Sequence, residues 1–96
     1  MIKDIYEESR IVGQIEYVYM NPTTIAIHEI CIFTPFRNNG YGRKAVSKLF
    51  INAVDTLIGL GADGSHQFWR NIGAEMSDFV NKGTDKYFTI HKRLFK

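Results

Sequence analysis

The sequence predicts one small domain of the mixed α/β (α+β) class, with a mostly antiparallel sheet, one long helix and one short helix. Apolar and polar residues alternate along the first third of the chain, as they do in strands. In the middle third, apolar residues recur every three or four positions, which is the helical period. A chain of 96 residues, 45% hydrophobic and 23% charged, suits a single globular domain.

The N-terminal segment reads as a β-hairpin. Two predicted strands, Ile2 to Tyr6 and Ile11 to Tyr19, flank the polar turn Glu8-Ser9-Arg10. Pro22 follows in Asn21-Pro22-Thr23, where a proline favours a turn because its φ is fixed and it has no N–H to donate.

A third strand is predicted from Thr24 to Phe33. Strict alternation along this strand puts two sets of apolar residues on opposite faces. Ile25, Ile27, Cys31 and Phe33 would share one face with Glu29, while Ala26, Ile30 and Ile32 would lie on the other beside His28. Because both faces are apolar, we expect this strand to be central in the sheet.

The helical pattern predicts one long helix from about Tyr41 to Asp55 or slightly beyond. The stretch from Thr56 to Ala62 has the composition of a short strand, but the helical pattern also claims Leu57 and Ile58. The boundary between the two elements therefore stays open at this stage.

Three elements are expected in the last third. A short helix from about Ser65 to Asn71 would end at Gly73, since glycine commonly terminates helices. Two strands, Glu75 to Val80 and Tyr87 to Phe95, would follow around a turn at 81–85.

One motif is set aside. The segment Gly59-Leu60-Gly61-Ala62-Asp63-Gly64 matches the glycine fingerprint of dinucleotide-binding domains letter for letter. That fingerprint requires a strand before it, a substantial helix after it and a further βαβ unit. The surrounding pattern does not offer this context, so we expect the segment to be a loop.

The net charge and the cysteine and histidine content limit the kinds of partner and metal site that we expect. A formal charge of +2, from 12 basic and 10 acidic residues, is too small to indicate a nucleic-acid partner. No apolar run approaches the roughly 20 residues that span a bilayer, so no membrane partner is expected. The single Cys31 fits a reducing compartment, and His66 and His91 lack the spacing of a metal site. We expect a soluble, cytoplasmic protein that binds no metal.

The most informative segment is Arg37-Asn38-Asn39-Gly40-Tyr41-Gly42, which joins the third strand to the predicted long helix. Its glycines allow a tight turn that leaves amide groups uncovered, and the helix start adds unpaired N–H donors. Such a loop can bind a phosphate or pyrophosphate, and Arg37, Arg43 and Lys44 can add positive charge. The alternative is an ordinary strand-to-helix turn with solvated basic residues.

Two blocks of the sequence resemble one family. Arg37 to Gly42 matches the signature R/Q-x-x-G-x-G/A of the GNAT superfamily of acetyl-CoA-dependent N-acetyltransferases, and the segment from Phe68 to Ala74 resembles its second block. The resemblance covers about Ile11 to Leu94 and implies a GNAT-like sheet with acetyl-CoA as acetyl donor. It further implies one minimal domain over residues 1–96 that lacks the usual N-terminal strand and two helices.

The resemblance also implies the residues of a cofactor site. They are Ile32, Thr34, Arg37, Asn38, Asn39, Gly40, Tyr41, Gly42, Arg43, Phe68 and Trp69. Three positions depart from the family pattern: Ala62 replaces a common asparagine, Trp69 a common tyrosine and Ala74 a common phenylalanine. The change at Trp69 matters most, because an indole is not a general acid near neutral pH.

Glu29 is the candidate catalytic base, since many relatives carry an acidic residue eight positions before the loop arginine. A base is needed because amines are mainly protonated at pH 7, and burial would make a carboxylate a better base. The alternative for Glu29 is a solvated strand position. The expected acceptor is a primary amine, including a protein lysine or N-terminus, in an open cleft or one completed by a homodimer partner. The competing hypothesis is a non-catalytic GNAT-fold module that acts through protein contacts.

Overall fold

The computed structural model describes residues 1–62, 64–79 and 83–96. Its elements are β1 (Ile2–Glu7), β2 (Arg10–Asn21), β3 (Thr24–Ile32), the 3₁₀ turn η1 (Thr34–Phe36), α1 (Tyr41–Ser47), β4 (Thr56–Gly61), α2 (His66–Asn71), β5 (Glu75–Phe79), β6 (Lys86–His91) and the 3₁₀ turn η2 (Lys92–Leu94). The mixed α+β class predicted from the sequence is confirmed.

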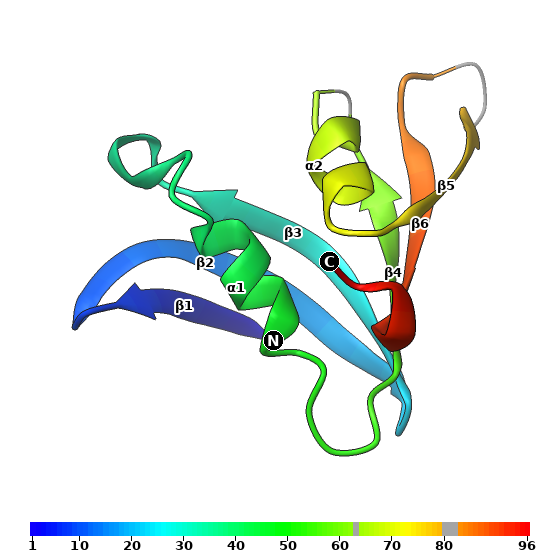
Figure 1. Cartoon of the computed structure of the whole chain (residues 1–96), viewed down its shortest axis with the longest axis horizontal. Coiled ribbons are helices and arrows are strands. Elements are labelled where there is room, and N and C mark those ends of the chain that lie inside the picture. The colour runs from blue at the N-terminus through cyan, green and yellow to red at the C-terminus, as the bar shows by residue number, and fades with distance from the viewer. Residues whose placement is uncertain (63, 80–82) are drawn as a thin grey trace.

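All six strands form one sheet in the order β1-β2-β3-β4-β6-β5. Among the described strands, only β3 and β4 pair in parallel, and the connection between them carries α1 (Figure 1). The remaining neighbours are antiparallel, as the sequence predicted. Neither α1 nor α2, the two α-helices of the described residues, is long and apolar enough to cross a membrane.

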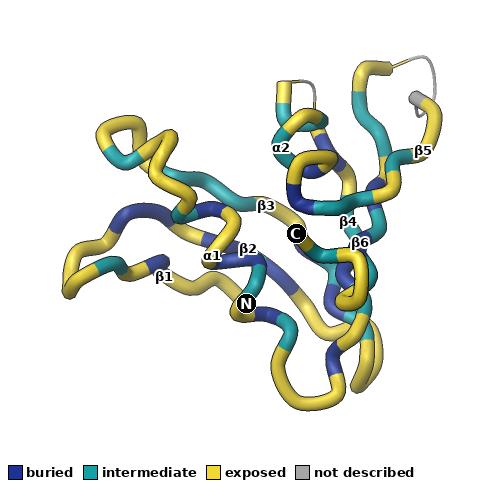
Figure 2. Tube along the Cα trace, viewed as in Figure 1, coloured by how far each residue is buried: buried dark blue, intermediate teal, exposed yellow. Residues whose placement is uncertain are grey.

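One hydrophobic core lies between the sheet and the two helices. Strand residues such as Ile25 and Leu57 pack there with Val46 of α1 and Trp69 of α2. Figure 2 marks the buried stretches of the chain in dark blue. We call this side of the sheet the helix face and the opposite side the open face. The core therefore forms on one side of the sheet.

The prediction of one long helix from Tyr41 to Asp55 is wrong. The helix α1 ends at Ser47, where i→i+3 hydrogen bonds from Leu49 to Val46 and from Phe50 to Ser47 replace the helical ladder. Asn52 then adopts a positive φ of 53°. Leu49 and Val54 are still buried, so the apolar spacing marks core contacts of an irregular segment.

The short strand considered from Thr56 to Ala62 is present as β4, which ends at Gly61, so the loop expected at residues 59–64 is wrong for its first half. A Cβ on Gly59 would lie 2.4 Å from Cζ of Phe88, and one on Gly61 would lie 3.2 Å from Cδ1 of Trp69. The glycines therefore make room for the aromatic stack above the strand. The glycine spacing that resembles the dinucleotide fingerprint is therefore explained by packing. Asp63, in the second half of the segment, lies outside the described residues.

The C-terminal elements match the prediction except at their ends. The short helix begins at His66, one residue later than expected, and ends at Asn71. The last strand ends at His91 because residues 92–94 form η2, although a strand was predicted to Phe95. Val80, Asn81 and Lys82, from the predicted strand end and turn, lie outside the described residues.

Gly73 holds the C-terminal segment against α2, so Gly73→Ala should strongly destabilise the fold. Its φ is +102°, and an added Cβ would lie 2.2 Å from the carbonyl oxygen of Leu94. We expect a loss of about 3 kcal/mol in the free energy of unfolding, measured by urea denaturation. The control is Gly64→Ala, because Gly64 has a φ of +87° with open space around it. Equal losses in both variants would show that the Leu94 contact contributes nothing.

Candidate functional site

A cleft opens where the two central strands diverge. The parallel pairing of β3 with β4 runs from Thr24 and Thr56 to Ile27 and Gly59, and β3 then continues to Ile32. The cleft between them has a volume of about 810 Å³. Its walls come from the end of β3, the loop before α1, the end of β4, and α2.

A β-bulge at His28 bends β3 away from β4. In the pairing with β2, Ile27 lies opposite Tyr17 and Glu29 opposite Glu16, so His28 is an extra residue. The bulge also changes which residues share a face. Glu29 and Cys31 lie on the open face, while Ile30 and Ile32 join Ile25 and Ile27 on the helix face, against the prediction from strict alternation.

The bulged end of β3 turns main-chain groups toward the cleft. The N–H of Phe33 donates to the carbonyl of Val12 in β2 at 2.8 Å. Because successive residues of a strand direct their main-chain groups to opposite sides, those of Ile30 and Ile32 face away from β2. The cleft wall therefore offers hydrogen-bonding groups of the kind that an extended ligand can pair with.

The loop before α1 is held by its own side chains. Nε of Arg37 donates to the carbonyl of Ile32 at 2.8 Å, and the amide of Asn39 donates to the carbonyls of Phe36 and Arg37. Asn38 and Gly40 take positive φ values of 65° and 77°. A Cβ on Gly40 would meet nothing within 4 Å, so this glycine is needed for its backbone conformation.

The second loop glycine makes a different contact. Gly42 is buried in the first turn of α1, and a Cβ there would lie 3.1 Å from Cε1 of Phe68. Tyr41 begins the helix and is half-buried, with Nζ of Lys44 5.9 Å from its ring centroid. The absence of a side chain at Gly42 therefore lets α1 approach α2 across the cleft.

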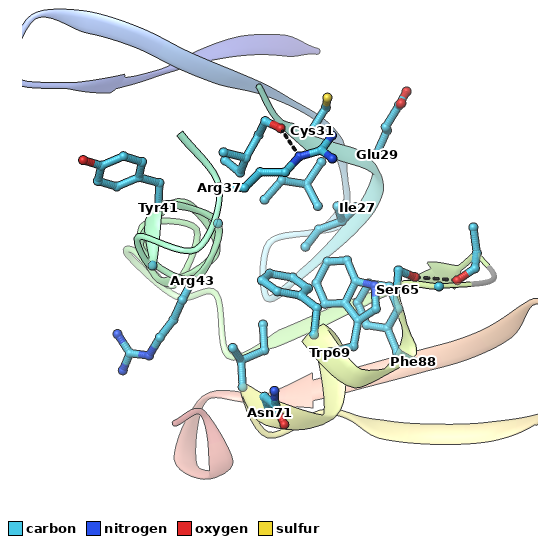
Figure 3. A pocket seen from close by; sticks show the side chains of 18 of the residues that line it. Ile27, Glu29, Cys31, Arg37, Tyr41, Arg43, Ser65, Trp69, Asn71 and Phe88 are labelled. Atoms are coloured by element: carbon cyan, nitrogen blue, oxygen red, sulfur yellow. Dashed lines mark hydrogen bonds between the residues drawn. The ribbon is translucent and has the colours of Figure 1, made fainter. Parts of the chain in front are cut away.

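Three residues expected at the cofactor site have other surroundings. Arg43 is among the residues that line the cleft, but its guanidinium donates to the main-chain oxygen of Lys96 and stacks over the ring of Phe95, and it points away from Trp69 (Figure 3). Thr34 begins η1, and Asn39 ties the loop to itself. Neither Thr34 nor Asn39 is among the residues that line the cleft.

An aromatic stack forms the cleft wall on the side of α2. Trp69 lies nearly parallel to Phe88, with 4.0 Å between the ring centroids (Figure 3). Phe68 meets Trp69 edge-on, with 4.8 Å between the centroids. Trp69 is only 4% exposed. Its indole is thus a packed part of the core as well as a cleft residue.

Glu29 is exposed, and its carboxylate extends from β3 on the same side as Cys31, away from the aromatic stack (Figure 3). The burial expected for Glu29 is therefore absent. The cleft passes between the strands, with the loop of Arg37 and Gly40 on the helix face and Glu29 on the open face.

Several lining residues were missed by the sequence reasoning. They include Ile30, Leu60, Ser65, Asn71 and Phe88. Leu60 was missed because its segment was expected to be a loop, and Ile30 contributes main-chain groups that depend on the bulge. Only the glycine spacing at Gly59 and Gly61 carried a signal, since it marks a surface on which large rings pack.

Solved structures with the same fold were found at low sequence identity. A GNAT family acetyltransferase from Elizabethkingia anophelis with acetyl-CoA bound has a TM-score of 0.71 and 16% identity, over 94% of this chain and 74% of that one. An acetyltransferase from Thermus thermophilus has a TM-score of 0.75 and 14% identity, over 94% and 62%. The PaiA N-acetyltransferase from Thermoplasma acidophilum, in complex with coenzyme A, has a TM-score of 0.74 and 10% identity, over 95% and 60%.

These similarities establish the fold, and the chain spans less than two thirds of the length of the latter two proteins. No curated protein matches the chain. The family model described as the acetyltransferase (GNAT) family matches residues 1–73, which include the β3 bulge, the loop before α1 and the end of α2. The chain therefore belongs to the acetyltransferase (GNAT) family.

Proposed function

We propose that this chain transfers an acetyl group from acetyl-CoA to a primary amine by direct attack of the amine on the thioester. The observation that carries the proposal is the cleft through the sheet. One end holds a glycine-containing loop between basic residues, and the other end opens beside the carboxylate of Glu29.

The residues present fit acetyl-CoA. Arg37 is held by one hydrogen bond from Nε to Ile32, which leaves its terminal nitrogens free to meet a pyrophosphate. Gly40 in its left-handed conformation leaves the neighbouring amides without a covering side chain. The main chain of Ile30 and the N–H of Ile32, whose carbonyl already accepts from Arg37, support an extended arm through hydrogen bonds, and the volume of about 810 Å³ suits a large ligand.

When bound, acetyl-CoA supplies a thioester whose acetyl carbon accepts the amine nitrogen while the carbon–sulfur bond breaks. The chain's own contribution is to position both reactants in one cleft and to aim N–H groups of the β3 wall at the developing negative charge. The aromatic stack of Phe68, Trp69 and Phe88 excludes water from one side.

Glu29 acts on the acceptor side. An exposed carboxylate attracts the ammonium form of an amine, takes a proton from it and passes that proton to solvent. Trp69 has no proton to give near neutral pH, so the departing thiolate receives its proton from water.

The test begins with calorimetric titration of the chain with acetyl-CoA. We expect saturable binding at micromolar concentrations, followed by release of free CoA when amines are added, measured by chromatography. The panel contains lysine peptides, peptides with free N-termini and small polyamines. A folded chain that does not bind acetyl-CoA would refute the proposal.

One observation favours a second function, a binding module that keeps the cofactor without using it. The position of the family's common tyrosine holds Trp69, whose indole is packed flat on Phe88. Acetyl-CoA binding without CoA release on any amine of the panel would favour this second function.

A further inference from the structure

Most of the charged strand residues are divided by sign between the two faces of the sheet, with Glu7 as an exception. Each basic strand residue pairs with a residue of the helix face: Lys3 with Ile15, Arg10 with Glu7, and Lys86 with Gly61. Glu7 marks that face because its carboxylate meets Lys44 of α1 at 3.2 Å. The helix face, where the loop of the cofactor site lies, is therefore the basic side.

The open face carries charge of the opposite sign. Its charged positions, placed by the strand register, are Asp4, Glu16, Glu29 and Glu75. Among the strand residues that the structure describes, the register places no lysine or arginine there. In a chain whose net charge is +2, four of the ten acidic residues thus lie on the face that Glu29 shares.

The same face exposes apolar side chains. They are Ile2, Tyr6, Ile11, Val18, Leu60 and Tyr87. Val18 pairs with Ala26, and Ala26 pairs in turn with Ile58, so an apolar row crosses the three central strands next to the acidic positions. Both α-helices of the described residues pack on the other face, so neither of them covers this row.

Glu16 and Glu29 lie directly opposite each other on neighbouring strands. Like charges in this position destabilise a strand pair, and a cation seated between them removes the repulsion. Asp4 lies one strand further out, where Nε2 of Gln14 donates to its carboxylate at 3.1 Å. The carboxylates therefore form a row that leads from the edge of the sheet to the cleft.

From this arrangement we propose that the open face binds a basic polypeptide segment and delivers one of its amines to the cleft beside Glu29. Sites for small molecules are concave and enclose most of the ligand, whereas this face is broad and uncovered by α1 or α2. Lysines of an extended segment would meet Asp4, Glu16 and Glu29, and its apolar residues would meet the row at Val18.

The inference rests on the proposed acetyl transfer, because it assigns the acceptor of that reaction. The probe is an N-terminally blocked peptide with lysine and valine alternating at every second position and serine between them, so that both meet one sheet face. Its twin carries glutamate in place of lysine, and spermidine serves as a small cation. Binding of each is measured by calorimetry, together with the separate affinity for acetyl-CoA.

We expect the lysine peptide to bind and to be acetylated, with affinity that falls as salt rises. Glu16→Gln should weaken peptide binding about fivefold, because one exposed ion pair is lost. The charge-matched control Glu8→Gln lies in the hairpin turn and should change nothing. Val18→Ser should weaken binding about threefold, and its control Ile51→Ser, also an exposed apolar residue, should not.

Other outcomes overturn the inference while leaving acetyl-CoA binding as a separate result. Equal peptide affinity in Glu16→Gln and Glu8→Gln would show that the acidic row does not bind the acceptor. Acetylation of spermidine without binding of the peptide would assign a small acceptor. A dimer in analytical ultracentrifugation that Val18→Ser dissociates would show that a second copy covers this face. If the native chain does not bind acetyl-CoA, the proposed function itself is refuted.

Discussion

Replacing Gly40 with aspartate should weaken acetyl-CoA binding at least about 100-fold. Gly40 lies in the left-handed region, with open space where a side chain would project into the proposed pyrophosphate site. A carboxylate there would lie within a few ångströms of the phosphates and repel them, whereas the native amides attract them. Calorimetric titration of the native and variant chains with acetyl-CoA measures the effect.

The matched control for this prediction is Gly40→Asn. Asparagine has nearly the shape of aspartate and tolerates a positive φ, so it changes backbone strain and bulk equally but adds no charge. We expect acetyl-CoA affinity within about threefold of the native value. If aspartate and asparagine weaken binding equally, the loop acts through its conformation and the phosphates lie elsewhere.

Glu29→Gln should lower kcat about 100-fold or more with little change in acetyl-CoA affinity. Glutamine keeps the shape of the side chain but accepts no proton from the amine. The affinity for acetyl-CoA should hold because Glu29 lies on the open face and the loop of Gly40 on the helix face. Steady-state kinetics with the best amine of the panel give kcat and KM separately.

Glu8→Gln is again the control, because it removes the same charge from the hairpin turn. A rise in KM with unchanged kcat would mean that Glu29 only attracts the acceptor, and the proton would then pass directly to water. If Glu29 is the base, raising the pH should partly restore kcat in Glu29→Gln, because a larger fraction of the amine is then neutral without help from a carboxylate.

Local sequence signals determined the strands, the short second helix and the loop from Arg37 to Gly42. Turn residues and alternation are properties of a few neighbouring positions, and they placed β1, β2 and β3 within one or two residues. The family signature, also a short local pattern, identified the loop before α1. These features depend little on what packs against them.

The length of α1 and the extent of β4 were decided by tertiary packing. Leu49 and Val54 follow the helical spacing, yet they reach the core from an irregular segment, since burial can be satisfied without a helix. Gly59 and Gly61 favour a loop by local propensity, but the rings of Phe88 and Trp69 need the space above them. Such requirements come from residues distant in the sequence.

Glu29 shows, at the site itself, the same difference between what local sequence predicts and what tertiary packing decides. The sequence alone selected Glu29, Arg37 and Gly40 as chemically important residues. Only the structure showed that the bulge at His28 shifts Glu29 to the open face and turns the main chain of Ile30 toward the cleft. A bulge depends on how one strand pairs with another, and one inserted residue reverses every side chain after it. The sequence was therefore enough to choose the residues of the site. The face of the sheet on which each side chain lies was determined by strand pairing.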